Sequence, residues 1–111
     1  MALLPNYRNA FIAIEKLEEY CLNPFHPTGK NKALVFKSVF GFTQEDAEFL
    51  RENILNEISK NDAIYDRVDE FGQRFTVDIK IRILDVKNVI RTNWIIKNSE
   101  DFPRLITCYV K

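Results

Sequence analysis

The ten residues RFTVDIKIRI at positions 74–83 decide the fold of this chain. Apolar and polar side chains alternate along the stretch almost without fault, which is the period of a β-strand with one buried and one wet face. Phenylalanine, valine and isoleucine, which strands favour, supply the apolar positions. Because only one face is apolar, we expect this strand to lie in an antiparallel sheet whose other face contacts water.

Three weaker strands flank this stretch. They are residues 63–69 before it and residues 89–97 and 104–110 after it. The connections fall where turn-forming residues cluster, at 69–72, 85–88 and 98–101. Since such short loops join consecutive antiparallel strands, the pattern predicts a four-stranded antiparallel meander. On the third strand, the residues predicted to share one face are Ile90, Thr92, Trp94 and Ile96.

Helical periodicity dominates the half of the chain that precedes the strands. Apolar residues recur every three or four positions in three segments, near residues 14–22, 30–40 and 44–60. Pro24 ends the first segment, Gly41 is well placed to end the second, and Thr43 with Asp46 resembles a capping box that starts the third. About three helices followed by four strands predict an α+β fold. We expect a single domain over residues 1–111, with the helices on one face of the sheet.

Composition excludes several classes of protein. Sixteen basic residues balance sixteen acidic ones, so the chain as a whole carries no field of one sign. No apolar run approaches the roughly 20 residues that span a bilayer, and no signal-peptide core is found, so we expect a soluble, cytoplasmic protein with no membrane partner. Cys21 and Cys108 lack the spacing and histidine neighbours of a zinc site. We expect reduced, buried thiols and no metal or other cofactor, with one disulfide in an exported form as the alternative.

The loop HPTGKNKALVF at residues 26–36 is the first candidate site. No acidic residue lies between positions 19 and 45, whereas His26, Lys30 and Lys32 do, so this region has a local positive charge. A glycine in the loop lets the backbone approach a ligand, and the following helix presents unpaired amide groups, so an anion such as phosphate is expected here. The structural alternative is that the lysines are solvated and His26 holds the loop through a backbone hydrogen bond.

The final strand, RLITCYV at residues 104–110, is the second candidate site, on what we expect to be a central or near-central strand. Leu105, Thr107 and Tyr109 are expected to point outward from the sheet. The residues expected to fill the core are Ile106, Cys108 and Val110. On the neighbouring strand, Arg91 and Asn93 are expected to lie on the same polar face as Thr107 and Tyr109. The structural alternative is a hydroxyl-bearing sheet surface stabilised by cross-strand pairs.

Several short motifs occur in order over residues 14–110. They are Lys16-Leu17 with Tyr20 and Leu22, His26-Pro27 with Gly29, Lys32-Ala33 and Phe36, then Gly72-Gln73, Trp94, and Pro103-Arg104-Leu105 with Thr107 and Tyr109. With its HP-x-G-x-x-KA-x-x-F and PRL-x-T-x-Y patterns, the chain resembles a small bacterial family catalogued as a domain of unknown function. That resemblance implies no established activity.

A second comparison concerns activity. Helices followed by a four-stranded sheet that ends in a Thr-x-Tyr strand are similar to the barnase, colicin and RelE-type ribonucleases, which serve as bacterial toxins and phage-borne nucleases. In these enzymes no metal is needed: the ribose 2′-hydroxyl attacks the adjacent phosphate, a base and an acid move protons, and cations hold the phosphate charge. The resemblance implies a catalytic set of His26, Arg91, Thr107 and Tyr109. The phosphate-binding set that it implies is Lys30, Lys32 and Arg104.

The ribonuclease resemblance implies RNA as a partner, together with a small cognate inhibitor protein. The zero net charge departs from the basic character common in ribonuclease toxins and weakens long-range attraction to RNA. An exposed aromatic residue could stack on a base, and Trp94 is a candidate either for that role or for the core. The alternative function is a non-catalytic interaction module, such as a partner of a small neighbouring protein or a component of a phage or secretion assembly.

Overall fold

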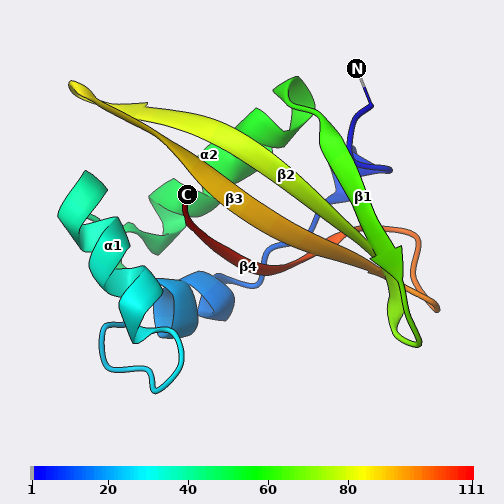
Figure 1. Cartoon of the computed structure of the whole chain (residues 1–111), viewed down its shortest axis with the longest axis horizontal. Coiled ribbons are helices and arrows are strands. Elements are labelled where there is room, and N and C mark those ends of the chain that lie inside the picture. The colour runs from blue at the N-terminus through cyan, green and yellow to red at the C-terminus, as the bar shows by residue number, and fades with distance from the viewer. Residues whose placement is uncertain (1) are drawn as a thin grey trace.

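The computed structural model describes residues 2–111 and has helices first and strands afterwards, as the sequence predicts (Figure 1). The main elements are the π-helix Lys16–Cys21, α1 (Lys30–Phe40), α2 (Ala47–Glu57), β1 (Ala63–Val68), β2 (Gly72–Ile83), β3 (Val86–Lys97) and β4 (Arg104–Val110). Single 3₁₀ turns lie at Tyr7–Asn9, Gln44–Asp46 and Ile58–Lys60. Among residues 2–111, no helix is long and apolar enough to cross a membrane.

The four strands form one antiparallel sheet in the order β1-β2-β3-β4, which is the predicted meander. β2 and β3 pair without interruption from Gly72 opposite Lys97 to Ile83 opposite Val86, and they cross the molecule as two long twisted arrows in Figure 1. The turn between them is tighter than we predicted, because it consists of residues 84–85. β4 lies at an edge of the sheet, whereas we expected a central or near-central strand. In a meander, the first and last strands necessarily form the edges.

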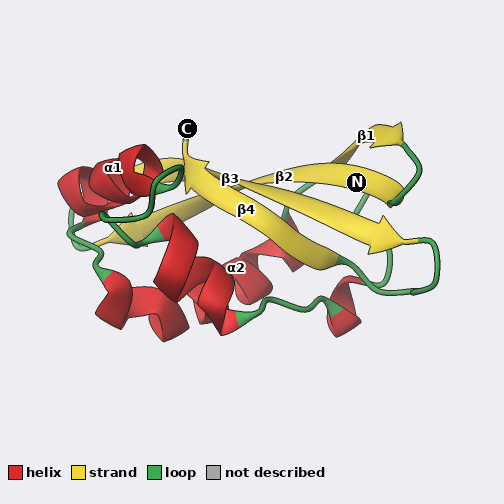
Figure 2. Ribbon diagram, turned by 90° about the horizontal axis from the view of Figure 1, so that it is seen from below, coloured by secondary structure: helices red, strands yellow, loops and turns green. Residues whose placement is uncertain are grey.

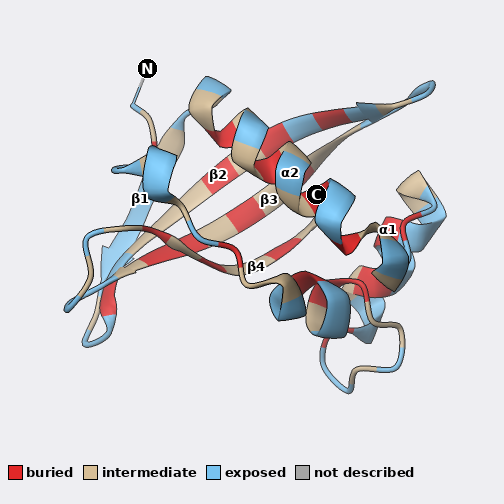
Figure 3. Ribbon diagram, turned by 180° about the vertical axis from the view of Figure 1, so that it is seen from behind, coloured by how far each residue is buried: buried red, intermediate tan, exposed pale blue. Residues whose placement is uncertain are grey.

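α2 covers one face of the sheet and supplies most of the helical side of the core. Figures 2 and 3 show α2 lying across β2 and β3, with buried bands alternating along these strands. The stripe that the sequence predicts for α2 and its flanking turns is buried in full: Ala47, Leu50, Ile54 and Ile58. Val77, Ile79 and Ile81 of β2 are buried opposite it, and these side chains belong to one continuous core. α1 lies beside β4 at the sheet edge (Figures 1 and 2).

The helix ends follow the predicted signals. Asp46 accepts a hydrogen bond from the Thr43 amide (2.8 Å), and the Thr43 hydroxyl accepts one from the Glu45 amide (3.3 Å), so the capping box is present. Gly41 ends α1 with φ 73°, a left-handed conformation that suits glycine. The first helix differs from the expectation, since it is wound as a π-helix in which the Leu22 amide reaches back to the Leu17 carbonyl (2.8 Å).

A β-bulge in β4 changes which side chains face the core. Asn93 pairs with Thr107 while Trp94 pairs with Leu105, so Ile106 is an extra residue without a partner. Leu105 is therefore buried, and our prediction that it points outward with Thr107 is wrong. Ile106, which we placed in the core, is only half-buried for the same reason.

Trp94 is a core residue. Its side chain is fully buried, and its Nε1 donates a hydrogen bond to Thr92 Oγ1 (2.8 Å), which in turn donates to the Val77 carbonyl (2.6 Å). This chain satisfies every buried polar group of the Trp94 and Thr92 side chains. Trp94 is thus unavailable to stack on a base. Ile96, which we expected on the same buried face, is half-buried, and Ile95 on the other face is buried instead.

The segment before the first helix packs against the start of β4. Phe11 forms a parallel bridge with Arg104: its amide donates to the Pro103 carbonyl (2.9 Å), and its carbonyl accepts from the Leu105 amide (3.0 Å). Leu4 and Ile12 are buried in the core. The amino-terminal segment therefore covers part of the edge that β4 would otherwise expose.

Candidate functional site

Lys32 lies in a half-buried cluster where α1 meets the final strand. Its ammonium group donates hydrogen bonds to Tyr20 Oη (3.3 Å) and to Thr107 Oγ1 (3.4 Å). It also lies 5.3 Å from the ring centroids of Tyr20 and Tyr109, within cation–π range of both. Within residues 2–111, no carboxylate forms an ion pair with Lys32. Its charge is held by hydroxyl groups and aromatic rings, and it remains available to compensate an external anion.

The fold places these groups together from two distant parts of the sequence. Ala33 and Phe36 are buried and fix the rotation of α1, so that the neighbouring Lys32 reaches the sheet edge. Thr107 and Tyr109 point away from the core on β4, as predicted, because they alternate with the buried Cys108. Lys32 and Thr107 are separated by 75 positions in the chain.

His26 holds the loop that precedes α1. Its Nδ1 accepts hydrogen bonds from the amides of Thr28 (3.1 Å) and Gly29 (3.0 Å), and its ring packs edge-on against Tyr20 with a centroid separation of 4.8 Å. In the neutral imidazole, an accepting Nδ1 places the ring proton on Nε2. This geometry agrees with the structural alternative from the sequence, in which His26 holds the loop through a backbone hydrogen bond. The catalytic role of His26 stays a prediction.

Gly29 is required by the close approach of this loop to Tyr20. A Cβ atom added at Gly29 would lie 2.5 Å from the Tyr20 carbonyl oxygen and 3.1 Å from a carbon of its ring. Tyr20 thus contacts His26, Gly29 and Lys32 at once. The His-Pro-x-Gly motif and the lysine that follows it are parts of one arrangement built around this tyrosine.

A second polar network continues from Tyr109 across the outer face of the sheet. Arg91, which pairs with Tyr109 in the strand register, donates two hydrogen bonds to Asp78 (2.9 and 3.0 Å), and Lys111 donates a third (3.0 Å). Arg91 and Lys111 hold the pKa of Asp78 below its usual value, and the same ion pair raises the pKa of Arg91. Since Asp78 already compensates much of its charge, Arg91 is a weaker anion ligand than Lys32.

Two buried thiols lie behind Thr107. Cys21 Sγ is 3.7 Å from Thr107 Oγ1, and both Cys21 and Cys108 are free and buried, as the sequence predicts. A hydrogen bond from the Cys108 thiol lowers the pKa of Cys21 to about 7, with smaller contributions from Thr107 and Lys32. The same bond, together with burial, raises the pKa of Cys108. Because Cys21 is buried, its thiol supports the cluster from the core side and is not exposed to a substrate.

The structure brings together some of the predicted site residues and separates others. Lys32 contacts both Thr107 and Tyr109, and His26 packs against Tyr20, which also contacts Lys32. Lys30 lies exposed at the first turn of α1. Arg104 is at the opposite end of β4, where it makes a bidentate ion pair with Glu100 (2.7 Å each).

Tyr20 and Cys21 belong to the cluster, but our sequence analysis gave them no site role. The available signal was the position of Tyr20 at the boundary of the apolar stripe of the first helix, which marks a half-buried side chain. Nowhere in residues 2–111, this cluster included, could a group of three or more histidine, cysteine or acidic side chains hold a metal ion.

Comparisons with known proteins add one finding. No curated protein and no solved structure matches the chain. The family described as "Domain of unknown function (DUF6883)" matches residues 3–111, which is nearly the whole chain. The chain therefore belongs to the DUF6883 family.

Proposed function

We propose that this domain is a metal-independent endoribonuclease whose scissile phosphate binds at the cluster of Lys32, Thr107 and Tyr109. One observation carries the proposal: the Lys32 ammonium, without a carboxylate partner among residues 2–111, lies 3.4 Å from a hydroxyl on the outward side of the final strand. A cation and a neighbouring hydroxyl group are the kinds of group that stabilise the charge on a phosphate during transfer.

Each of the three residues has a different role in the proposed reaction. Lys32 compensates the negative charge that develops on the non-bridging oxygens, and Thr107 donates a hydrogen bond to the same phosphate. Tyr109 carries a phenolic hydroxyl two residues from Thr107 on the same side of β4, and Arg91 lies opposite it in the strand register. We assign to Tyr109 the delivery of a proton to the leaving 5′-oxygen.

In the proposed reaction, the ribose 2′-oxygen forms a bond to phosphorus while the bond from phosphorus to the 5′-oxygen breaks. The products are a 2′,3′-cyclic phosphate and a 5′-hydroxyl, and the 2′-hydroxyl proton passes to a base. His26 is the one histidine of the chain, and its ring packs against Tyr20 beside Lys32. Its service as that base requires the loop to release Nδ1 from the amides of Thr28 and Gly29.

Strand β1 supports a second candidate function, a protein-interaction role. β1 is an edge strand on which Ile64 and Val68 are both exposed. An apolar edge strand is a template to which another chain can add a strand. A small cognate inhibitor protein is the partner that this role and the ribonuclease proposal share.

The test of the ribonuclease proposal is cleavage of an unstructured RNA pool by purified protein in buffer containing EDTA. We expect the wild type to leave 2′,3′-cyclic phosphate ends, and Lys32→Met to lose about 10²- to 10³-fold in rate, as removal of one charge-stabilising group does in other enzymes. Lys37→Met is the matched control, because Lys37 lies five residues away on the same helix and is exposed. It should cleave as the wild type does.

A DNA strand of the same sequence is the second control, since it lacks the 2′-hydroxyl nucleophile and should stay intact. RNA left uncut by the wild type would end the proposal. So would equal activity of Lys32→Met and Lys37→Met.

A further inference from the structure

A cavity of about 350 Å³ lies on the outer face of the sheet, near the start of β4. Six of its lining residues carry an aromatic ring or a positive charge: Phe11, Phe71, Lys16, Arg74, Lys97 and Arg104. They come from the segment before the first helix, the start of that helix, the β1–β2 turn and strands β2 to β4. None of them belongs to the Lys32 cluster.

The cavity and the Lys32 cluster lie on the same face. Arg74, Ile95 and Arg104 are opposite one another across β2, β3 and β4, and Arg74 alternates with the core-facing residues of β2. A neighbouring hollow shares Arg74 with this cavity and reaches Asn93, which pairs with Thr107 of the cluster. Phe71 precedes Gly72, which pairs with Lys97, and Lys97 lies four residues from Asn93 on β3, a distance of about 13 Å along the strand. A short single strand of RNA can therefore reach from the proposed phosphate site to the cavity.

The cavity is positively charged although the whole chain is neutral. Arg74 is paired with Asp69 (2.6 Å) and Arg104 with Glu100 (2.7 Å). Lys16 and Lys97 also line the cavity, and in the described part of the chain neither forms an ion pair. The positive charge of these two unpaired lysines favours a ligand that carries negative charge.

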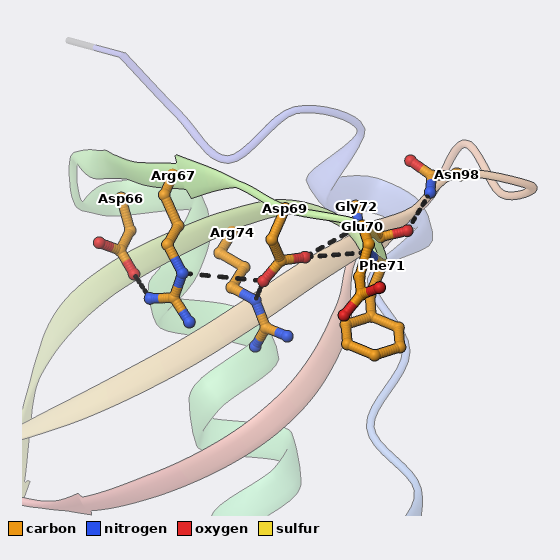
Figure 4. A network of polar contacts seen from close by, with 8 residues as sticks. All are labelled: Asp66, Arg67, Asp69, Glu70, Phe71, Gly72, Arg74 and Asn98. Carbon is orange, nitrogen blue, oxygen red and sulfur yellow. Dashed lines mark hydrogen bonds and ion pairs between the residues drawn. The ribbon is translucent and has the colours of Figure 1, made fainter.

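Phe71 is held at the edge of the cavity by a rigid turn (Figure 4). The Asp69 carboxylate accepts hydrogen bonds from the amides of Phe71 (2.9 Å) and Gly72 (3.3 Å), and Asn98 Nδ2 donates to the Glu70 carbonyl (2.7 Å). Gly72 has φ 151° and approaches the neighbouring strand so closely that no side chain fits there. The Phe71 ring is nevertheless 59% exposed. An aromatic ring that its backbone turn keeps exposed to solvent is suited to stacking on another planar ring.

Phe11 and Arg104 provide a second flat surface in the cavity. The Arg104 guanidinium lies 5.0 Å from the Phe11 ring centroid, and Phe11 is 45% exposed. Aromatic rings and guanidinium planes are the groups on which proteins stack unpaired bases of RNA. Among the ligand classes with negative charge, single-stranded nucleic acid also supplies the planar base that these surfaces fit.

We propose that this cavity is a nucleobase subsite, in which an unpaired RNA base stacks on Phe71 while a flanking phosphate contacts Lys16 and Lys97. The inference rests on the proposed ribonuclease function and specifies its substrate as single-stranded RNA. A base within a duplex is already stacked and paired, so it cannot enter the cavity.

The test is equilibrium binding of a short fluorescein-labelled 2′-O-methyl oligouridylate, which the proposed reaction cannot cleave. Phe71→Ala should weaken binding about ten-fold or more, the usual effect of removing one stacking ring, whereas Phe71→Trp should retain affinity. Phe25→Ala is the matched control, because Phe25 is 88% exposed on the loop before α1, and it should change affinity less than two-fold. Replacing Lys16 and Lys97 by methionine should reduce the dependence of affinity on salt.

The outcomes separate this inference from the proposed function. Loss of binding in Phe71→Ala supports the subsite whether or not the wild type cleaves RNA, and a wild type that binds without cleaving would refute only the ribonuclease. Cleavage by the wild type with unchanged binding and KM in Phe71→Ala would overturn the subsite alone. Unlabelled poly-glutamate, duplex RNA and single-stranded RNA can each be tested as competitors. If poly-glutamate or duplex RNA competes as strongly as the single strand, the subsite is also overturned, because the surface then binds any polyanion.

Discussion

Gly29 offers a direct test of how tightly the loop before α1 is held against Tyr20. The Gly29 backbone has φ −90° and ψ −9°, a region open to every residue, so its conformation alone does not require glycine. Its surroundings do, because an added Cβ atom would lie 2.5 Å from the Tyr20 carbonyl oxygen. Gly29→Ala must therefore displace either the loop or the first helix.

The cost follows from two opposing effects. Forcing a methyl group into a packed contact costs about 1–3 kcal/mol, and the loop shift also weakens the hydrogen bond from the Gly29 amide to His26 (3.0 Å). Alanine restricts the unfolded chain, which returns about 0.4–1 kcal/mol. We expect a net loss of about 1–2 kcal/mol in the free energy of unfolding, or roughly 5–10 °C in Tm for a domain of this size.

Thermal and urea unfolding followed by circular dichroism measure this loss, with Gly41 as the control position. Gly41 has φ 73° and nothing within 4 Å of an added Cβ atom, so its requirement for glycine arises from the backbone alone. Asparagine tolerates that conformation and should largely preserve stability at position 41. At position 29, asparagine should destabilise, although helix-capping preference by itself would favour it over glycine. Wild-type stability in Gly29→Ala or Gly29→Asn would refute the reasoning.

Three further predictions concern stability. Thr92→Val should cost about 1–3 kcal/mol in urea unfolding, because it leaves the buried Trp94 N–H without an acceptor, and Thr92→Ser should recover most of it; equal stability of the valine variant would contradict this. Asp78→Asn should cost about 1 kcal/mol at pH 7. Since the folded pKa of Asp78 lies below its usual 3.8, the wild type should lose this advantage as the pH falls below about 4, and a difference that grows on acidification would contradict the ion pair. Leu84→Asn should raise Tm, with a gain of about 0.5–1 kcal/mol, because Leu84 is exposed with φ 53° in the β2–β3 turn; a lower Tm would show that its side chain stabilises the turn.

Local periodicity is sufficient to predict most of the fold. The alternation over residues 74–83 predicts β2 and its buried face, and the apolar stripe of α2 predicts the helical side of the core. The capping box at Thr43 and the glycine at position 41 predict two helix ends. Each of these signals is formed by residues that lie close together in the sequence. They can therefore be recognised without knowing the three-dimensional structure.

Features that depend on contacts between distant segments could not be predicted. The bulge at Ile106 arises where β4 pairs with β3, and it reverses the facing of Leu105. The bridge between Phe11 and Arg104 has no periodic signal, because a single residue pairs there. The π-helical winding of residues 16–21 could not be predicted for a different, local reason. Over so short a length, a π-helix and an α-helix have the same spacing of apolar residues.

The candidate site was predicted in parts and not as an assembly. The sequence indicates an acid-free loop and a hydroxyl-bearing strand, but not that Lys32 donates to Thr107. It also does not indicate that Arg91 is bound by Asp78, which lies on another strand. For His26, residue type alone left proton transfer and loop anchoring open, and the contacts of Nδ1 favour anchoring.

The most direct test of the central claim is an NMR titration with a non-cleavable 2′-O-methyl dinucleotide, following the backbone amides and the Lys32 side chain. The account predicts that the largest saturable shifts occur at Lys32, Thr107 and Tyr109, and that Lys32→Met abolishes them. Shifts confined to Lys30 and the first turn of α1, or no saturable shift at any of the three residues, would contradict it.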